Sequence, residues 1–406
     1  MNKKYNAVKI TENVHWVGAI DWQIRDFHGY STDKGTTYNA YLIMADKITL
    51  VDTVKKPFVE ELISRISSVV DPKKIDYIIS NHSEMDHSGS LVEMMELIEP
   101  ERVYVSKMGR KNLESHFHNN VAGKLTEVKD GEEISLGNMN VAFLESRMLH
   151  WPDSMISYLK EEKLVFSQDA FGMHLASTER FADELDDALL EDEAAKYYAN
   201  ILLLYSPVVA KFLDKLSRAN LDIDIVAPDH GPIWRGKEDI GRIVDFYARW
   251  AAQKPENKAL VVYDTMWKST EKMARAISEG LSDGGADVKV ISLSANHRSD
   301  VATQVLDAGA LVVGSPTMNN QIFPTLADTM VYLKGLKPKN LIGAAFGSYG
   351  WSGESVKDLS RMLEEMGVEL VDEGVSALFI PDDEALGRCY DLGKTIAERL
   401  AAITKK

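Results

Sequence analysis

The chain has 406 residues, of which 45% are hydrophobic and 27% charged, a composition typical of soluble globular proteins. Its length exceeds the ~100–200 residues of one ordinary domain, so we expect two or three domains. No apolar run approaches the ~20 residues of a membrane-spanning helix, and the net charge of -16 argues against a nucleic-acid partner.

The first residues of the chain and its single cysteine restrict the expected cellular location and the kinds of site that the chain can form. Residues 1–6 contain two lysines but no apolar segment follows them, so we expect no secretory signal and a cytoplasmic location. Because Cys389 is the only cysteine, the chain cannot form an internal disulfide, a zinc ribbon or an iron–sulfur cluster. Any redox chemistry must therefore use other metal ligands or a bound organic cofactor.

Apolar patterns along the chain predict two α/β domains. Short apolar runs separated by turns predict antiparallel strands over residues 8–54, and helix and strand patterns then alternate up to Trp250. Residues 184–216 have a long helical pattern, which we expect to break near Pro207. The polar, proline-interrupted segment 252–257 marks a boundary. The expected domains are 1–252 and 257–406, and the second has the regular βαβ rhythm of a doubly wound parallel sheet.

One stretch, residues 81–89, is unusually rich in metal-binding groups. It reads Asn-His-Ser-Glu-Met-Asp-His-Ser-Gly and directly follows an apolar run, 77–79, that predicts a buried strand. The alternative is a solvated polar loop, which we would favour for a lone His–Asp pair. Two imidazoles and two carboxylates within six residues instead favour a metal site at a strand end.

Further candidate ligands follow other predicted strands of the first domain. His150, Asp169 and His230 each come after an apolar run, and the ends of strands in one sheet converge in space. Together with His82, Glu84, Asp86 and His87 they make seven candidate ligands, enough for two metals if Asp169 bridges them. His174 is a candidate for a supporting position around the metals. The remaining histidines are interpreted as a strand residue, His15, and as surface residues, His116, His118 and His297.

These residues carry a family resemblance. The run His82-x-Glu84-x-Asp86-His87, followed by His150, Asp169 and His230, resembles the metal motif of the metallo-β-lactamase fold, with Glu84 where the hydrolases have a second histidine. That spacing and that glutamate are similar to the flavodiiron proteins, and the similarity extends over the whole chain. It implies an αββα sandwich followed by a flavodoxin-like domain. It also implies one iron at His82, Glu84 and His150, a second at Asp86, His87 and His230, and Asp169 as the bridge.

The chemistry of the residues agrees with iron. Exchanging one imidazole for Glu84 leaves four histidines and three carboxylates, a hard and anionic set that suits iron better than zinc and stabilises its oxidised state. Affinity order alone does not exclude zinc. Each metal would have three ligands of its own and one ligand that both metals share. This leaves each metal an open coordination position, where a small diatomic molecule could bind.

The second domain has three candidate cofactor loops after successive strands. The stretch 264–270 precedes a helix, whose N-terminus can bind phosphate, and it resembles the flavodoxin phosphate loop in Thr265, Ser269 and Thr270. Trp267 and Lys268 replace the middle Thr and Gly of that loop. Ligands of such folds bind at the carboxyl ends of the strands, which predicts an FMN site. The candidate FMN-binding residues are Thr265, Met266, Trp267, Lys268, Ser269, Thr270, Ser315, Pro316, Thr317, Met318, Asn319, Asn320, Gly347, Ser348, Tyr349, Gly350, Trp351 and Gly353.

We therefore expect an FMN-containing diiron reductase of O2, NO or both. The sequence does not rank these gases, because both are small apolar diatomics. The resemblance puts His28, Trp151 and Tyr197 near the substrate pocket, where the alternative for each is ordinary core packing. A zinc hydrolase with an appended flavodoxin domain, and a pure electron-transfer module with a structural metal, are the competing hypotheses.

Missing sequence motifs and the family resemblance together predict the electron donor and the oligomeric assembly. No G-x-G-x-x-G follows a strand, so we expect no nicotinamide site, and electrons should come from a rubredoxin-like carrier. The single cysteine excludes a fused rubredoxin. The family resemblance and the short linker predict a head-to-tail homodimer, or a dimer of dimers, in which FMN of one chain serves the irons of the other.

Overall fold

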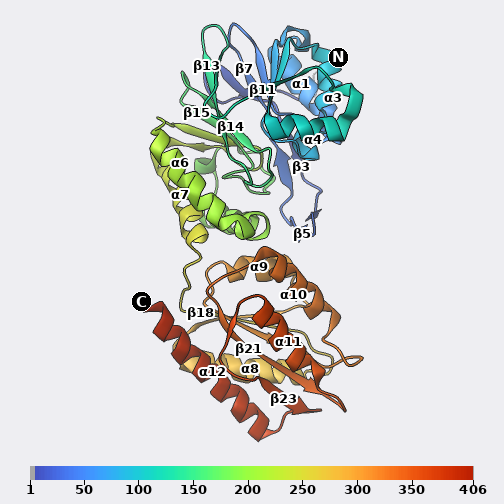
Figure 1. The fold of residues 1–406 in the computed structure, drawn as a ribbon, viewed down its shortest axis with the longest axis vertical. Coiled ribbons are helices and arrows are strands. Elements are labelled where there is room, and N and C mark those ends of the chain that lie inside the picture. Colours follow the sequence, from blue (N-terminus) through green and yellow to red (C-terminus); the bar gives the residue numbers. More distant parts are fainter. Residues whose placement is uncertain (1–4, 406) are drawn as a thin grey trace. The chain divides into compact units, whose positions relative to one another are not determined.

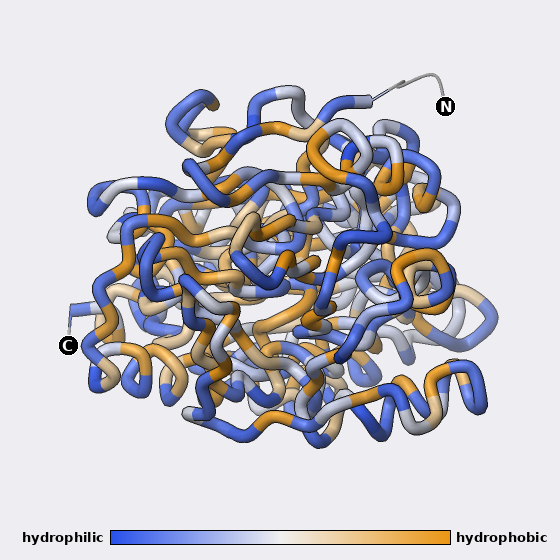
Figure 2. Tube along the Cα trace, turned by 90° about the horizontal axis from the view of Figure 1, so that it is seen from above, coloured by the Kyte–Doolittle hydropathy of each residue, from blue (hydrophilic) through white to orange (hydrophobic). Residues whose placement is uncertain are grey.

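The computed structural model describes residues 5–405, which form two compact units. The first unit comprises the residues up to Tyr197 together with Pro207–Ala248, and the second comprises Tyr198–Ser206 and the residues from Arg249 onward. We keep 1–252 and 257–406, the limits expected from the sequence, as the proposed domain limits. Met1–Lys4, which entered the prediction that a secretory signal is absent, lie outside the described residues. Apolar stretches of the trace are short (Figure 2), and no helix in the described part is long and apolar enough to cross a membrane.

The first unit contains two large sheets (Figure 1). The strands of the seven-stranded sheet, in spatial order, are β1 (Val8–Lys9), β2 (Val14–Trp16), β7 (Tyr41–Ile43), β8 (Thr49–Val51), β9 (Tyr77–Ser80), β10 (Arg102–Ser106) and β11 (Leu125–Val128). Those of the six-stranded sheet are β12 (Glu133–Ser135), β13 (Asn140–Glu145), β14 (Met155–Leu159), β15 (Leu164–Gln168), β16 (Ile225–Pro228) and β17 (Trp234–Arg235). Two small hairpins, β3 (Ala19–Asp21) with β6 (Thr36–Tyr38) and β4 (Asp26–Phe27) with β5 (Tyr30–Ser31), complete the strands.

The two sheets of this unit face each other, and helices cover the outer face of the seven-stranded sheet. One apolar core lies between the two sheets, where Tyr41 and Phe166 pack at a ring distance of 5.2 Å. A second core joins the outer face of the seven-stranded sheet to helices that carry Leu62 and Leu113. These helices are α1 (Val59–Val69), α3 (Leu91–Ile98) and α4 (Lys107–Phe117). The arrangement confirms the predicted metallo-β-lactamase-like fold.

Strand direction brings the candidate ligands to one edge of the sheets. Strands β8, β9, β10 and β11 run parallel, as do β15 and β16, so their carboxyl ends share an edge. All four residues of β9 are buried because both faces of its sheet are covered. The metal-binding stretch follows β9 directly and includes the short helix α2 (Met85–Ser88).

The helical region after residue 184 is interrupted just before Pro207, as expected. Helix α5 (Asp187–Tyr197) is followed by a π-helical turn over Tyr198–Leu202 and a 3-10 turn over Leu203–Tyr205. Helix α6 (Ser206–Ala219) then contains Pro207 as its second residue. The predicted break near Pro207 is therefore confirmed, and the proline itself is tolerated because it stands in the first turn of a helix, where its missing N–H has no partner to lose. Helix α7 (Gly236–Ala252) comes after β17.

The second unit is a doubly wound parallel sheet, which confirms the flavodoxin-like prediction. Its strands in spatial order are β19 (Asp287–Ser292), β18 (Lys258–Tyr263), β20 (Ala310–Gly314), β21 (Ile342–Tyr349) and β22 (Glu369–Leu370), and β23 (Val375–Leu378) extends the edge beside β21. Its helices are α8 (Ser269–Asp283), α9 (Arg298–Val305), α10 (Pro324–Leu336), α11 (Glu354–Glu365) and α12 (Asp383–Thr404). Helix α9 and strands β22 and β23 are short.

Candidate functional site

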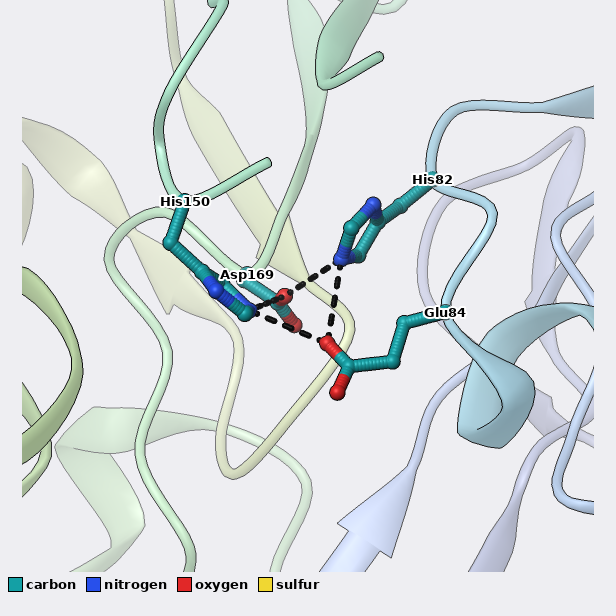
Figure 3. Close-up of side chains that lie close together, drawn as sticks. All are labelled: His82, Glu84, His150 and Asp169. Atoms are coloured by element: carbon teal, nitrogen blue, oxygen red, sulfur yellow. Dashed lines mark hydrogen bonds and ion pairs between the residues drawn. The ribbon is translucent and has the colours of Figure 1, made fainter. Parts of the chain in front are cut away.

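Four predicted ligands meet in one buried group at the strand ends. His82 and Glu84 come from the loop after β9, while His150 and Asp169 project from two other segments (Figure 3). The Nε2 atom of His82 lies 3.2 Å from Oε2 of Glu84 and 3.2 Å from Oδ2 of Asp169. The Nε2 atom of His150 lies 3.1 Å from each of the same two oxygens. Two imidazole nitrogens and two carboxylate oxygens therefore converge on one point.

A second group lies beside the first. The Nε2 atom of His230 lies 3.2 Å from Oδ2 of Asp86, and the Nε2 atom of His87 lies 3.3 Å from Oδ1 of the same carboxylate. Asp86, His87 and His230 are all buried. The ligating atoms of these three residues lie within 4.8 Å of one another, close enough to hold one metal ion.

Asp169 faces both groups, one oxygen to each. Its Oδ2 atom is near His82 and His150, whereas its Oδ1 atom lies 3.1 Å from Nε2 of His87 and 3.4 Å from Nε2 of His230. The side chain follows β15, whose last residue, Gln168, has a φ of 51°. This orientation is the one required of a carboxylate that bridges two metals.

The buried polar atoms of the cluster fit a cationic group. Both carboxylate oxygens of Asp86, Oδ1 of Asp169 and Nε2 of His87 have no hydrogen-bond partner in the described part of the chain. Burial alone would lower the pKa of His82, but hydrogen bonds to Asp153, Asp169 and Glu84 hold that pKa well above its usual range. The carboxylates therefore stabilise positive charge at the centre, and a donor set of four imidazoles and three carboxylates fits two iron ions.

The three predicted pocket residues lie around this cluster. His28 contacts it directly, with Nε2 2.6 Å from Oε1 of Glu84. Trp151 packs edge-on against His82, with ring centres 5.2 Å apart and planes at 89°. Tyr197 is buried and lies 5.2 Å from the ring of His174, which in turn lies 4.5 Å from the ring of His230. Their roles in a reaction stay proposals.

The remaining histidines divide as follows. His174 is buried beside the cluster and its Nδ1 lies 2.7 Å from Oγ1 of Thr36. Burial and the neighbouring His230 hold the pKa of His174 well below its usual range, so its ring is neutral. His15 lies in β2. His118 is exposed, and so is His116, whose ring stacks on Trp151 at 6.4 Å. His297 caps the N-terminus of α9.

Two buried aspartates were not singled out from the sequence. Asp229 forms a third candidate group with His87 and Asp169, and its Oδ2 lies 3.5 Å from Nδ1 of His87. Asp153 lies 3.1 Å from Nδ1 of His82. Their proximity to predicted ligands was the available signal, since Asp229 directly precedes His230 and Asp153 lies three residues after His150. The histidine that each aspartate meets is distant in sequence, so the contact itself could not be predicted.

The second unit has a cavity of about 550 Å³ at the carboxyl ends of its strands. Its predicted lining residues are Met266, Trp267, Ser269, Pro316, Thr317, Asn319, Asn320, Ser348, Tyr349, Gly350 and Trp351. Ser352, Phe379 and Ile380 also line it and were missed. All three loops that the sequence singled out therefore meet at one cavity, of a size that suits a bound cofactor.

The other predicted FMN residues are not part of this lining, namely Thr265, Lys268, Thr270, Ser315, Met318, Gly347 and Gly353. Thr270 is buried and its Oγ1 lies 3.2 Å from Oγ of Ser348. A Cβ added to Gly347 would lie 2.1 Å from the carbonyl oxygen of Ser315, so the close approach of two loops requires glycine there.

The start of α8 fits a phosphate group. The residue before it, Lys268, has a left-handed backbone with φ 65°, and no side chain caps the helix. Its first N–H groups are therefore open to an anion. The Oγ1 atom of Thr265 is buried without a hydrogen-bond partner in the described residues. Free backbone donors and an unpartnered hydroxyl are the groups that an FMN phosphate would use.

Comparison with known proteins covers nearly the whole chain. Residues 36–231 match the family described as ODP family beta lactamase, and residues 261–393 match the flavodoxin family. A nitric oxide reductase of Moorella thermoacetica is 48% identical over 97% of this chain and 99% of its own length.

Two solved structures are similar over nearly their full length. Rubredoxin oxygen:oxidoreductase from Desulfovibrio gigas superposes with a TM-score of 0.97 at 45% identity, covering 99% of this chain and 100% of that one. A flavodiiron protein of Giardia intestinalis superposes with a TM-score of 0.94 at 33% identity, covering 98% of both chains.

Proposed function

We propose that this chain, which belongs to the flavodiiron protein family, is an oxidoreductase that reduces O2 to water, NO to N2O, or both. The observation that carries the proposal is the position of Asp169, whose two oxygens face two separate groups of imidazoles and carboxylates. Two adjacent redox metals can deliver electrons to one small molecule. The relatives named nitric oxide reductase and rubredoxin oxygen:oxidoreductase support both substrates.

The side chains that would hold iron follow from the geometry. One ion would be held by His82, Glu84 and His150, the other by Asp86, His87 and His230, with Asp169 between them. When bound, the irons supply electrons and open coordination positions for a small gas. His28 holds Glu84 from the outer side by a hydrogen bond, and the rings of Trp151 and Tyr197 pack against His82 and His174.

FMN would occupy the cavity of the second unit. The open N-terminus of α8 and the hydroxyl of Thr265 would bind its phosphate, and Trp267, Tyr349 and Trp351 offer aromatic surface to its ring system. FMN accepts and passes on single electrons or pairs, which suits a relay between a protein donor and the irons.

A small carrier protein of the rubredoxin type is the proposed electron donor. The name of the Desulfovibrio gigas relative supports this class of donor. We also propose a cytoplasmic protein that works as a homodimer or a dimer of dimers. Trp267 and Trp351 are exposed at the FMN cavity. Adjacent exposed aromatic side chains are often covered by a partner chain, so these two support an assembly.

The competing zinc hydrolase is disfavoured. Glu84 replaces the second histidine of the hydrolase motif, and the relatives that match over the full chain are reductases. Metal analysis after aerobic purification separates the two functions, because the proposal requires two irons per chain.

In the decisive assay, photoreduced rubredoxin reduces the protein under anaerobic conditions, each gas is then added in turn, and the products are identified. Water from O2 or N2O from NO supports the proposal. A protein that holds iron and FMN but consumes neither gas would instead be an electron-transfer module with a structural metal.

A further inference from the structure

The histidines of the two candidate metal groups are not held alike on their outer sides. His82 presents Nε2 to Glu84 and Asp169, while its Nδ1 lies 3.1 Å from Oδ2 of Asp153. His230 also presents Nε2 to its group, but its Nδ1 donates to the backbone carbonyl of Thr37 at 2.6 Å. The Nδ1 atom of His82 therefore faces a carboxylate, whereas that of His230 faces a neutral carbonyl.

The carboxylate of Asp153 is itself fixed by several donors. Its Oδ2 accepts a 2.7 Å hydrogen bond from the backbone N–H of Ser83, and its Oδ1 accepts a 3.0 Å bond from Nδ2 of Asn112 in α4. The Nδ2 of Asn112 also lies 3.0 Å from Oγ of Ser83. The hydroxyl of Ser106 donates to the backbone carbonyl of Asp153 at 2.7 Å. The side chain of Asp153 is buried and meets only donors, as an anion requires.

The other metal group lacks an equivalent contact. Asp229 is the nearest carboxylate behind it, but its Oδ2 lies 3.5 Å from Nδ1 of His87. Within the described residues, neither oxygen of Asp229 and neither ring nitrogen of His87 has a hydrogen-bond partner. The tight carboxylate–histidine contact is therefore confined to the group that contains His82.

We propose that Asp153 is a positioning residue that makes the His82–Glu84–His150 group the tighter of the two iron sites. This inference rests on the proposed function. A carboxylate that accepts the Nδ1–H of His82 fixes the tautomer in which Nε2 carries the lone pair. It also raises the basicity of that nitrogen toward a metal. Asn112 and Ser83 keep the carboxylate in place, so the imidazole loses little orientation freedom when iron binds.

The test is an anaerobic titration of the metal-free protein with Fe(II), comparing the wild type with two substitutions. Asp153→Asn keeps an acceptor for His82 but removes the charge, and it should weaken the tighter binding step by about tenfold. Asp153→Ala removes both and should weaken it by up to about 100-fold. The weaker step should stay unchanged in both. Circular dichroism and FMN content check that each variant folds, and Asp153→Asn carries the test if Asp153→Ala does not fold.

Two matched controls separate positioning from packing. Ser106→Ala removes a buried hydrogen bond to the backbone of Asp153 but leaves its carboxylate on His82, so both binding steps should stay as in the wild type. Asp229→Asn makes the same chemical change beside the other group and should leave the tighter step unchanged.

A spectroscopic readout assigns the affected site. With one equivalent of isotopically enriched iron, the Mössbauer spectrum of the wild type should show one dominant doublet, whereas Asp153→Asn should distribute iron over two environments. The inference is overturned if Asp153→Asn titrates like the wild type, or if Ser106→Ala loosens iron as much as Asp153→Ala. A wild-type protein that never takes up two irons would instead overturn the proposed function.

Discussion

The Nε2 atom of His28 lies 2.6 Å from Oε1 of Glu84, while Oε2 of the same carboxylate faces His82 and His150. Hydrogen bonding to Glu84 raises the pKa of His28, although partial burial opposes the shift. The imidazole of His28 is 62% exposed, so it reaches Glu84 from the solvent side. Glu84 is thus held at both oxygens, and His28 limits its rotation.

Replacing His28 by Ala should reduce iron affinity and turnover by about tenfold or more, because partners behind a ligand contribute roughly that much. Gas consumption and iron content per chain measure the two effects. His116→Ala is the control, since His116 is exposed and touches Trp151 without a hydrogen bond to the cluster. Unchanged turnover in His28→Ala would show that Glu84 needs no support from outside.

Replacing Glu84 by His should shift the site toward zinc and abolish reduction of the gases while FMN stays bound. The substitution restores the ligand set of a hydrolase and removes one anionic oxygen that stabilises oxidised iron. Metal analysis, the flavin absorbance and the gas assay report the three properties. A variant that keeps two irons and full turnover would contradict this account of metal selection.

The metal ligands could be predicted because the sequence pattern that identifies each of them is local. Four of them lie within six residues after β9 of the seven-stranded sheet, and His150, Asp169 and His230 each follow a strand of the six-stranded sheet. The expectation of a single sheet was wrong, because the two sheets pack face to face and present their ligands at a shared edge. Asp153 lies three residues after His150, but nothing local indicates that it meets His82. Its contact with His82 spans 71 positions in the sequence, and only the folded loop shows it.

Three of the segments that line the cofactor cavity were predicted from the sequence, and the fourth was missed. Strand β23 has only four residues, alternating buried and exposed, and no glycine-rich loop follows it. The segment after it was therefore not recognised as cavity wall. Phe379 has a φ of 53° and donates its N–H to the carbonyl of Tyr349 at 2.7 Å, a placement that sequence periodicity does not encode.

Replacing Phe379 by Ala should weaken FMN binding by about tenfold, which corresponds to about 1.4 kcal/mol and is the scale of burying part of an aromatic ring. Phe379 lines the cavity, and its ring would lie 3.1 Å from a Cβ added to Gly350. Fluorescence titration of FMN into the apoprotein measures the affinity. Leu378→Ala is the matched control, because Leu378 is exposed but does not line the cavity. Equal losses in both variants would exclude a specific contact by Phe379.

Cys389 should not react with thiol reagents in the native protein. It is buried in α12, and burial raises the pKa of its thiol to about 12. An unfolded thiol ionises near pH ~8.5, so unfolding releases a proton between the two values. The free energy of unfolding should therefore fall by up to about 1.4 kcal/mol per pH unit in this window, and Cys389→Ala should remove that component. Rapid labelling of the folded protein at pH 8 would contradict the burial.

The proposed transfer of electrons between chains predicts complementation in a mixed dimer. One chain carries His82→Ala and His230→Ala, which remove a ligand from each metal group. The other carries bulky replacements of Ser269 and Gly350, which fill the FMN cavity. Co-expression with two tags isolates the mixed dimer. If FMN of one chain serves the irons of its partner, one intact pair remains and about half of the wild-type activity is expected, because two pairs are reduced to one.

Two controls make this outcome interpretable. Each doubly substituted chain, purified alone, should be inactive, and the mixed dimer should contain half the wild-type FMN and half its iron. Exposed Trp267 and Trp351 beside the cavity offer apolar surface for such an interface, so Trp351→Glu should weaken the dimer. Because Trp351 also lines the FMN cavity, the activity of this variant is compared per bound FMN. An inactive mixed dimer with both cofactors at half content would instead assign the transfer to a single chain.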